Sequence, residues 1–307
     1  MRVRELGGSG VSVSVVGVGC NNFGVRIDEA ATKAVVDAAI DSGITFFDTA
    51  DSYGGGASET LLGRYVQGRR ERVTIATKFG WWKDPADTGA CGRRGYVRSA
   101  LEASLRRLGT DYVDLYQYHR PDRVTPLAET LGAMSELVSE GKVRCIGASR
   151  MTAAEVAEAV RLTRDGVLAP FVSVQNEYSW LARDAERDVL PECQRDGVGF
   201  IPYFPLANGL LTGKYARARS APAGTRLAMA DQLSTISDET WDRLKALADF
   251  GARHDVGLLQ VAIGGLAAVP AIVSVIEGAS TSDQVRANAA AGDWEPTDEQ
   301  LHELQGL

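Results

Sequence analysis

Short apolar segments of strand length alternate with amphipathic segments of helix length along almost the whole chain. The expected strands are residues 15–17, 44–47, 73–77, 112–118, 143–147, 172–175, 199–203 and 272–276. Strands separated by helices pair in parallel through right-handed crossovers, so this order limits the fold to a parallel sheet. Eight such strands predict an α/β fold of the (β/α)8 TIM barrel type, and a doubly wound sheet is the alternative.

The expected helices carry clear start and stop signals. Asp28 is a favourable N-cap, apolar residues follow at helical spacing, and Gly43 ends the segment. Pro191 is expected to kink or restart its helix. Further helices are expected at residues 58–65, 96–108, 126–140, 152–164, 185–195, 238–254 and 298–304, with two more flanking the last strand.

The amino-terminal segment predicts a β-hairpin. Gly7, Gly8 and Gly10 lie between two short alternating runs within residues 3–16. In a barrel, such a hairpin is expected to cover the lower end. No linker rich in proline, serine or glycine divides the chain, so we expect one domain over residues 1–307.

Composition excludes several functional classes. The net charge is -7 and no block of Lys or Arg stands out, which argues against nucleic-acid binding. The four cysteines are scattered and the histidines are not clustered, so we expect no metal site and no disulfide framework, and a cytoplasmic location. Polar and helix-breaking residues interrupt the apolar stretch 256–276, which predicts a buried helix and strand and no membrane span.

Four polar residues follow three of the expected strands. Asp48 and Tyr53 follow the second, Lys78 the third and His119 the fourth. The carboxyl ends of barrel strands meet at one mouth, so these side chains are expected to share a pocket. A phenol with a pKa of about 10 needs a neighbouring cation to work near neutrality, and Lys78 supplies one. The set predicts a general acid that protonates an alkoxide as a hydride arrives at carbon.

These residues belong to a longer set of motifs that resembles the aldo-keto reductase superfamily, of a bacterial type with a short carboxy terminus. The motifs are FFDTADSYG at residues 46–54, Ser58-Glu59, Thr77-Lys78, LYQYH at 115–119, LGGSG at 6–10, GKVR at 141–144, VQNEY at 174–178, LLTGKY at 210–215 and GAS at 278–280. The resemblance implies reversible reduction of aldehydes or ketones with hydride from NADPH. It makes Tyr53 the acid, tuned by Lys78 and Asp48, with His119 orienting the carbonyl.

The resemblance also implies a nicotinamide dinucleotide site. Tyr203 is expected to stack on the nicotinamide, with carboxamide contacts from Ser149 and from Asn176 or Gln175. The remaining contacts implied for the pyrophosphate and adenosine are Leu206, Gly209, Leu211, Lys214, Arg226, Gly278, Ser280, Gln284 and Asn288. A helix beginning near Ser282 would direct its positive end at phosphate.

The chain departs from the family pattern at four positions. Arg150 follows Ser149 where Asn is common, and it is expected to meet either a phosphate or a charged substrate. Phe204 replaces a common Ser, Glu277 a common Pro, and Ala287 a Glu that often binds the adenine amine. These changes leave NADH open beside NADPH.

The loops at the barrel mouth are expected to form the substrate pocket. The expected walls are Cys20, Phe23, Trp81, Trp82 and Tyr178. The chain ends soon after its last helix, which favours an open mouth and broad carbonyl specificity. A small-molecule carbonyl is the expected partner, and a monomer is the expected state. The alternatives are a Schiff-base aldolase using Lys78 and a nucleotide-sensing subunit resembling the potassium-channel β subunits.

Overall fold

A computed structural model of the chain describes residues 1–81, 89–217 and 233–307. Its main sheet has eight parallel strands in the order β10-β3-β4-β5-β6-β7-β8-β9. A parallel bridge between Phe200 and Ile272 links β9 to the segment that enters β10, and this nearly closes the sheet into a barrel. The strands are β3 Val16–Gly19, β4 Phe46–Asp48, β5 Thr74–Phe79, β6 Val113–Tyr118, β7 Val143–Ser149, β8 Phe171–Glu177, β9 Gly199–Tyr203 and β10 Val275–Glu277. The predicted (β/α)8 barrel is therefore confirmed.

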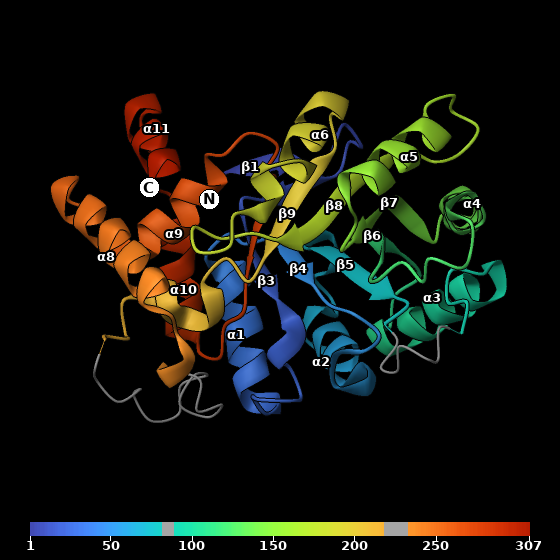
Figure 1. Cartoon of the computed structure of the whole chain (residues 1–307). Helices are drawn as coiled ribbons and strands as arrows, with labels where there is room; N and C mark the ends of the chain where they lie inside the picture. Colours follow the sequence, from blue (N-terminus) through green and yellow to red (C-terminus); the bar gives the residue numbers. More distant parts are fainter. Residues whose placement is uncertain (82–88, 218–232) are drawn as a thin grey trace.

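Helices surround the strands, as Figure 1 shows. The Asp28 side chain accepts a hydrogen bond from the Ala31 amide and so caps α1, as the sequence predicts. The predicted helix 185–195 is split into η4 Asp184–Glu186 and a helix that starts at Val189, so Pro191 lies in a first turn, where proline is tolerated. The helices are α1 Glu29–Asp41, α2 Ala57–Val66, α3 Arg94–Leu108, α4 Leu127–Ser139, α5 Ala153–Thr163, α6 Val189–Asp196, α8 Asp238–Arg253, α9 Leu258–Ala267, α10 Ser282–Ala291 and α11 Asp298–Gly306.

Side chains alternate between the barrel interior and the layer beneath the helices. Phe46 and Leu115 belong to an inner cluster, whereas their neighbours Phe47 and Tyr116 pack in the outer layer. Because side chains on a strand alternate, Gln117 faces the interior like Leu115. The apolar inner cluster fills the body of the barrel, so polar side chains of a reaction site are expected at its mouth.

The hairpin β1 Val3–Glu5 and β2 Ser12–Ser14 covers the lower end of the barrel. Leu6, Val11 and Val13 are buried within the inner cluster, which confirms the predicted plug. The Thr74 hydroxyl donates to the Ser12 carbonyl at 3.0 Å and joins β5 to the hairpin.

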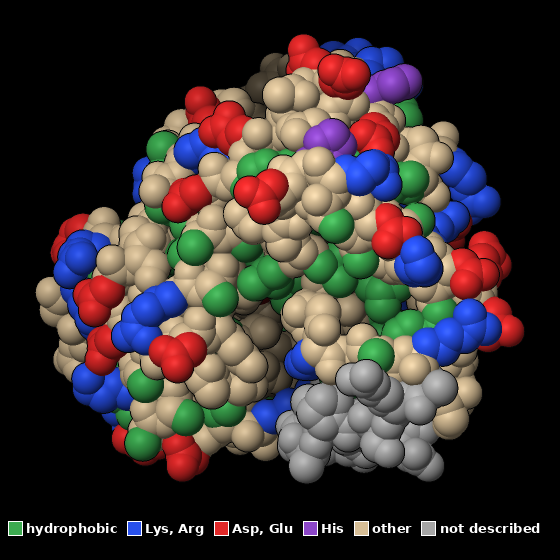
Figure 2. All heavy atoms as spheres, turned by 90° about the vertical axis from the view of Figure 1, so that its left-hand side faces the viewer, with side chains coloured by type: hydrophobic (Ala, Val, Ile, Leu, Met, Phe, Trp, Pro, Cys, Tyr) green, Lys and Arg blue, Asp and Glu red, His purple; other side chains and the backbone are tan. Residues whose placement is uncertain are grey.

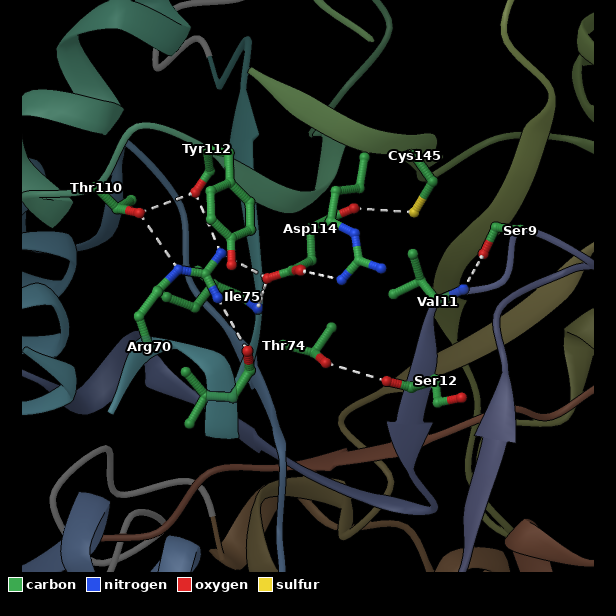
Figure 3. A network of polar contacts seen from close by, with 12 residues as sticks. Ser9, Val11, Ser12, Arg70, Thr74, Ile75, Thr110, Tyr112, Asp114 and Cys145 are labelled. Atoms are coloured by element: carbon green, nitrogen blue, oxygen red, sulfur yellow. Dashed lines mark hydrogen bonds and ion pairs between the residues drawn. The ribbon is translucent and has the colours of Figure 1, made fainter. Parts of the chain in front are cut away.

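An ion-pair network lies beside this plug (Figure 3). The buried Asp114 carboxylate accepts hydrogen bonds from Arg70 at 2.6 Å, Arg144 at 2.9 Å and the Ile75 amide at 2.9 Å. These groups lie at the starts of β5, β6 and β7 or, for Arg70, just before β5. The network compensates the buried charge and stabilises the lower end, away from the mouth.

The apolar stretch 256–276 contains the buried helix α9 and leads into β10, as expected. In the described ranges, no helix has both the length and the apolar character needed to cross a membrane. Likewise, no three His, Cys, Asp or Glu side chains among the described residues are grouped so as to hold a metal ion. Figure 2 shows acidic and basic side chains interspersed on one face of the molecule.

Candidate active site

The four predicted residues meet at the carboxyl ends of neighbouring strands. Asp48 ends β4, Lys78 lies in β5, and His119 follows β6. Tyr53 begins the 3-10 helix η2 Tyr53–Gly56. Beyond the end of β4, the Asp51 amide donates to the Lys78 carbonyl at 3.1 Å, which holds the loop carrying Tyr53 against β5. The parallel strands of the barrel therefore place Asp48, Lys78 and His119 side by side, and the short loop after β4 adds Tyr53 to them.

Lys78 is the centre of the site. Its ammonium donates to Asp48 Oδ2 at 2.5 Å, to the Thr49 carbonyl at 3.0 Å and to Tyr53 Oη at 3.3 Å. The side chain is fully buried. Burial by itself lowers the pKa of Lys78, but the neighbouring Asp48 carboxylate and Tyr53 outweigh it, and the pKa is raised. Lys78 is therefore a permanent cation directed at the Tyr53 oxygen.

Asp48 accepts hydrogen bonds from three strands other than its own. Besides Lys78 on β5, the amide of Gln117 on β6 donates to Asp48 Oδ1 at 3.1 Å and that of Gln175 on β8 donates at 3.0 Å. Sequence reasoning missed Gln117. The signal that identifies it is the pair Gln117 and His119, two residues apart and so on the same face of a strand.

Tyr53 remains protonated at neutral pH. Burial raises the pKa of its phenol, the Lys78 ammonium lowers it, and the net direction is upward. The sequence reveals only the cation, which by itself would lower the pKa of Tyr53. A protonated phenol with an adjacent ammonium is suited to donating a proton to an oxyanion.

His119 is neutral. Burial first, and then the charges of Lys78 and Arg150, hold the pKa of its imidazole well below the usual value of 6.5. Its ring meets the Tyr53 ring edge-on, with centroids 5.8 Å apart, and lies 4.7 Å from the Trp81 ring. The buried Nδ1 has no hydrogen-bond partner among the described residues. A neutral imidazole can position a carbonyl oxygen without adding charge.

The residues expected at the nicotinamide have different surroundings. Tyr203 is half-buried at the end of β9, and Ser149 is buried at the end of β7. Asn176 is engaged elsewhere, because its amide donates to the Met151 carbonyl at 2.7 Å and accepts from the Met151 amide at 3.2 Å. Gln175 directs its amide at Asp48. Tyr203 therefore keeps a partly exposed aromatic ring, whereas the amides of Asn176 and Gln175 are already engaged within the protein.

The loop after β9 has an unusual backbone. It forms η5 Ala207–Thr212, within which Asn208 and Gly209 have positive φ values of 57° and 94°. A Cβ atom at Gly209 would come within 3.0 Å of Lys214 Nζ, so glycine allows this close approach. Leu211 is buried and Lys214 is exposed, which leaves an ammonium at the loop surface.

The segment after β10 forms the expected helix start. The Thr281 side chain caps α10, and Gln284 Oε1 accepts from the Ser280 amide at 2.8 Å. Asn288 is buried. Asn22, which sequence reasoning missed, donates to the Ala279 carbonyl at 3.3 Å and so links this segment to the loop after β3. No local pattern identifies Asn22, because its partner lies 257 residues away.

Three of the residues that depart from the family pattern differ in their surroundings. Glu277 is fully enclosed, burial raises its pKa to about 8, and its Oε1 has no partner in the described part of the chain. Phe204 has a positive φ of 55° and packs edge-on against Tyr203, with ring centroids 5.2 Å apart. Ala287 is exposed on α10.

Only Trp81 of the described pocket residues faces the site with an exposed portion. Cys20, Phe23 and Tyr178 are fully buried. The Tyr178 hydroxyl donates to Glu186 at 2.7 Å, and its ring packs edge-on against Phe200 in the outer layer. This placement leaves no face of Tyr178 for a substrate. Trp82 and Arg226 lie outside the described residues.

The residues present fit a nicotinamide dinucleotide. Tyr203 offers a ring for stacking, and Lys214 and the amino-terminal end of α10 offer positive charge to phosphate. When bound, such a cofactor would supply a hydride to a carbonyl carbon at the site. Tyr53, Lys78 and His119 would then offer the matching proton and the contact to the carbonyl oxygen.

Comparison with known proteins gives one consistent family. The model of the aldo/keto reductase family matches residues 15–307. Probable voltage-gated potassium channel subunits beta of Oryza sativa subsp. japonica and Arabidopsis thaliana are 34% and 33% identical to the chain, and each alignment covers 96% of this chain and 92% of the relative. Among solved structures, aldo-keto reductase AKR11C1 from Bacillus halodurans in its holo form is similar, with a TM-score of 0.81 and 32% identity, over 100% of this chain and 96% of that one.

Proposed function

The chain belongs to the aldo/keto reductase family, and from that premise we propose that it is an NADPH-dependent reductase of aldehydes and ketones that also works in reverse as an alcohol dehydrogenase. The observation that carries the proposal is the buried Lys78 ammonium held between Asp48 at 2.5 Å and the Tyr53 phenol at 3.3 Å. A protonated phenol beside a fixed ammonium is suited to donating its proton to an oxyanion that forms on the substrate. We further propose that the enzyme acts as a monomer, because the barrel buries its own core.

The four residues divide the work of carbonyl reduction. His119 orients the carbonyl oxygen toward Tyr53, and the Tyr53 phenol transfers its proton to that oxygen as the hydride reaches carbon. Lys78 stabilises the resulting phenolate, since its ammonium lies 3.3 Å from Oη. Asp48, in contact with Gln117 and Gln175, keeps Lys78 charged and fixed. In the reverse direction the phenolate accepts the proton of the alcohol.

The protonation state of Lys78 argues against an aldolase. A Schiff base requires the neutral amine as nucleophile, and catalytic lysines obtain it through a lowered pKa. Here Asp48 and Tyr53 raise the pKa of Lys78 despite burial. All three of its protons are also engaged in hydrogen bonds.

A nucleotide-sensing subunit is the second candidate. It is favoured by the relatives from Oryza sativa subsp. japonica and Arabidopsis thaliana, which are named as channel β subunits and align over 96% of this chain. Such a protein would bind the cofactor and report its redox state to a partner.

Cofactor titration followed by a carbonyl panel separates the two candidates. Fluorescence titration with NADPH and NADH gives the cofactor preference, which we expect to favour NADPH. Absorbance then follows oxidation of the bound cofactor with aromatic and aliphatic aldehydes and ketones. Turnover with several carbonyls supports the reductase. Cofactor binding without turnover on any carbonyl would instead favour the sensing subunit.

The rates of carbonyl reduction and of alcohol oxidation should change in opposite directions with pH. Reduction requires the protonated phenol, and burial raises the pKa of Tyr53, so kcat/KM for reduction should stay level through neutral pH and fall only in the alkaline range. Alcohol oxidation requires the phenolate and should rise with pH. His119 has a strongly lowered pKa, so neither profile should break near 6.5. Steady-state rates from about pH 6 to 10 measure this, and a break near 6.5 would contradict a neutral His119.

A further inference from the structure

Arg150 occupies a costly backbone position at the barrel mouth. It directly follows β7 and has a positive φ of 59°, a region that residues other than glycine rarely adopt. Its amide donates to the Gln175 carbonyl at 3.0 Å, which fixes the backbone there. The side chain is therefore directed by a strained, hydrogen-bonded turn and not by a flexible loop.

Two aromatic rings at the mouth hold the Arg150 guanidinium. Its Cζ lies 4.8 Å from the centre of the Tyr203 ring and 5.2 Å from that of Trp81. Trp81 in turn lies 4.7 Å from the ring of His119. One N–H of the guanidinium is engaged with the Tyr203 hydroxyl. Because a guanidinium has five N–H donors, stacking on aromatic faces leaves others along its edge for a planar anion.

The charge of Arg150 is uncompensated within the described residues. No carboxylate in residues 1–81, 89–217 and 233–307 forms an ion pair with it, whereas Arg123, also exposed and with a positive φ, pairs with Glu155 at 3.0 Å. The charge also lies close to the site. It adds to burial and Lys78 in lowering the pKa of His119, and it opposes the burial that raises the pKa of Tyr203.

We propose that Arg150 binds an oxyanion, carboxylate or phosphate, carried by the carbonyl substrate. This inference rests on the proposed reductase function and narrows its substrates to aldehydes or ketones that bear a negative charge near the reacting carbon. A bidentate contact between Arg150 and the anion would leave the carbonyl at His119 and Tyr53, with Trp81 beneath the body of the substrate.

The phosphates of the cofactor are a less suitable partner for Arg150. The groups that fit them are Lys214 after η5 and the amino-terminal end of α10, on the segments that follow β9 and β10. Arg150 follows β7 and lies over both Tyr203, the residue expected to stack on the nicotinamide, and Trp81, which is beside His119. It therefore lies at the nicotinamide end of the site, beside the groups expected to contact the carbonyl, and not with the groups that fit the phosphates.

The test compares two aldehydes that differ in charge. We expect wild-type protein with NADPH to have a higher kcat/KM for 4-carboxybenzaldehyde than for its neutral methyl ester. Arg150→Met keeps an apolar side chain on the rings but removes the charge, so the preference should fall about tenfold or more, with the ester nearly unaffected. Arg150→Lys should retain part of it. Added salt should reduce the wild-type preference and leave the Met variant unchanged.

Arg123→Met is the matched control, and it should preserve the preference. An unchanged preference in Arg150→Met would overturn the proposal, as would a variant that loses NADPH affinity and slows both aldehydes equally. Calorimetry with 4-carboxybenzyl alcohol and its methyl ester, added to the NADP+ complex, gives the same comparison without turnover. If wild type reduces neither aldehyde but binds the acid more tightly through Arg150, the reductase proposal fails and the anion site stands.

Discussion

Tyr53→Phe is expected to reduce the rate of carbonyl reduction by about 10²–10⁴-fold, the usual contribution of a positioned general acid. The substitution removes only the hydroxyl that lies 3.3 Å from the Lys78 ammonium. The phenyl ring retains its edge contact with His119, so the fold and cofactor affinity should be preserved. Single-turnover measurements with NADPH and a reactive aldehyde give the rate, and fluorescence titration gives the cofactor Kd.

Tyr178→Phe provides the matched control for this prediction. Tyr178 is fully buried, whereas Tyr53 is partly exposed, and the Tyr178 hydroxyl donates to Glu186 in the outer layer. Removal of that hydroxyl should cost some stability and leave the rate of reduction within about twofold of wild type. Undiminished turnover in Tyr53→Phe would remove Tyr53 from the role of acid.

Asp48→Ala is expected to lower the free energy of unfolding by about 3–5 kcal/mol, because it leaves the ammonium of Lys78 buried without a counter-charge. Both side chains are almost fully buried, at 0% and 1% exposure, so solvent does not screen the pair. Activity should fall with stability, since Lys78 loses the group that keeps it charged. Urea unfolding followed by circular dichroism measures the change.

The pH dependence of Asp48→Ala gives a second readout. Without the carboxylate, burial should depress the pKa of Lys78 in the folded state below its unfolded value. The unfolded chain would then bind more protons, so the stability of the variant should rise with pH. In wild type the pKa of Lys78 in the folded state is raised. The stability that the charged Lys78 contributes is therefore lost only as the pH rises through this folded-state pKa.

Two further variants identify the cause. Asp48→Ala combined with Lys78→Met should recover much of the lost stability, because the uncompensated charge is removed as well. Asp37→Ala breaks ion pairs with Lys33 and Arg69 that are at least partly exposed to solvent, and it should cost no more than about 1 kcal/mol. If the double variant were as unstable as Asp48→Ala, the buried charge would not be the origin of the effect.

The sequence predicts the barrel because each element carries its own local signals. Asp28 marks a helix start, and a short apolar segment marks each barrel strand. The meeting of the four candidate site residues is predictable for a related reason: strand ends meet at one mouth whatever the intervening helices contain. The hairpin plug likewise follows from a glycine turn between two short runs.

The remaining parts of the site depend on contacts across the barrel. Gln175 reaches Asp48 over 127 residues and Gln117 reaches it over 69, so no sequence spacing predicts either contact with Asp48. For Gln117, the spacing from His119 predicts only that the two share a face. The same limit explains Tyr178, for which a position after a strand end gives no indication that the hydroxyl turns outward to Glu186. For Tyr53, the sequence reveals the nearby cation but not the burial that opposes it.

The hydrogen bonds of Asp48 have a consequence for how such a protein can diversify. Its carboxylate joins β4 to β5, β6 and β8, so hydrogen bonds between the barrel strands hold the counter-charge of the Lys78 ammonium in place. Substitutions in the segments around Trp81 and Arg150 can then change which substrates bind without moving Lys78 relative to Tyr53. The chemical step and the choice of substrate can evolve as separable modules of one chain.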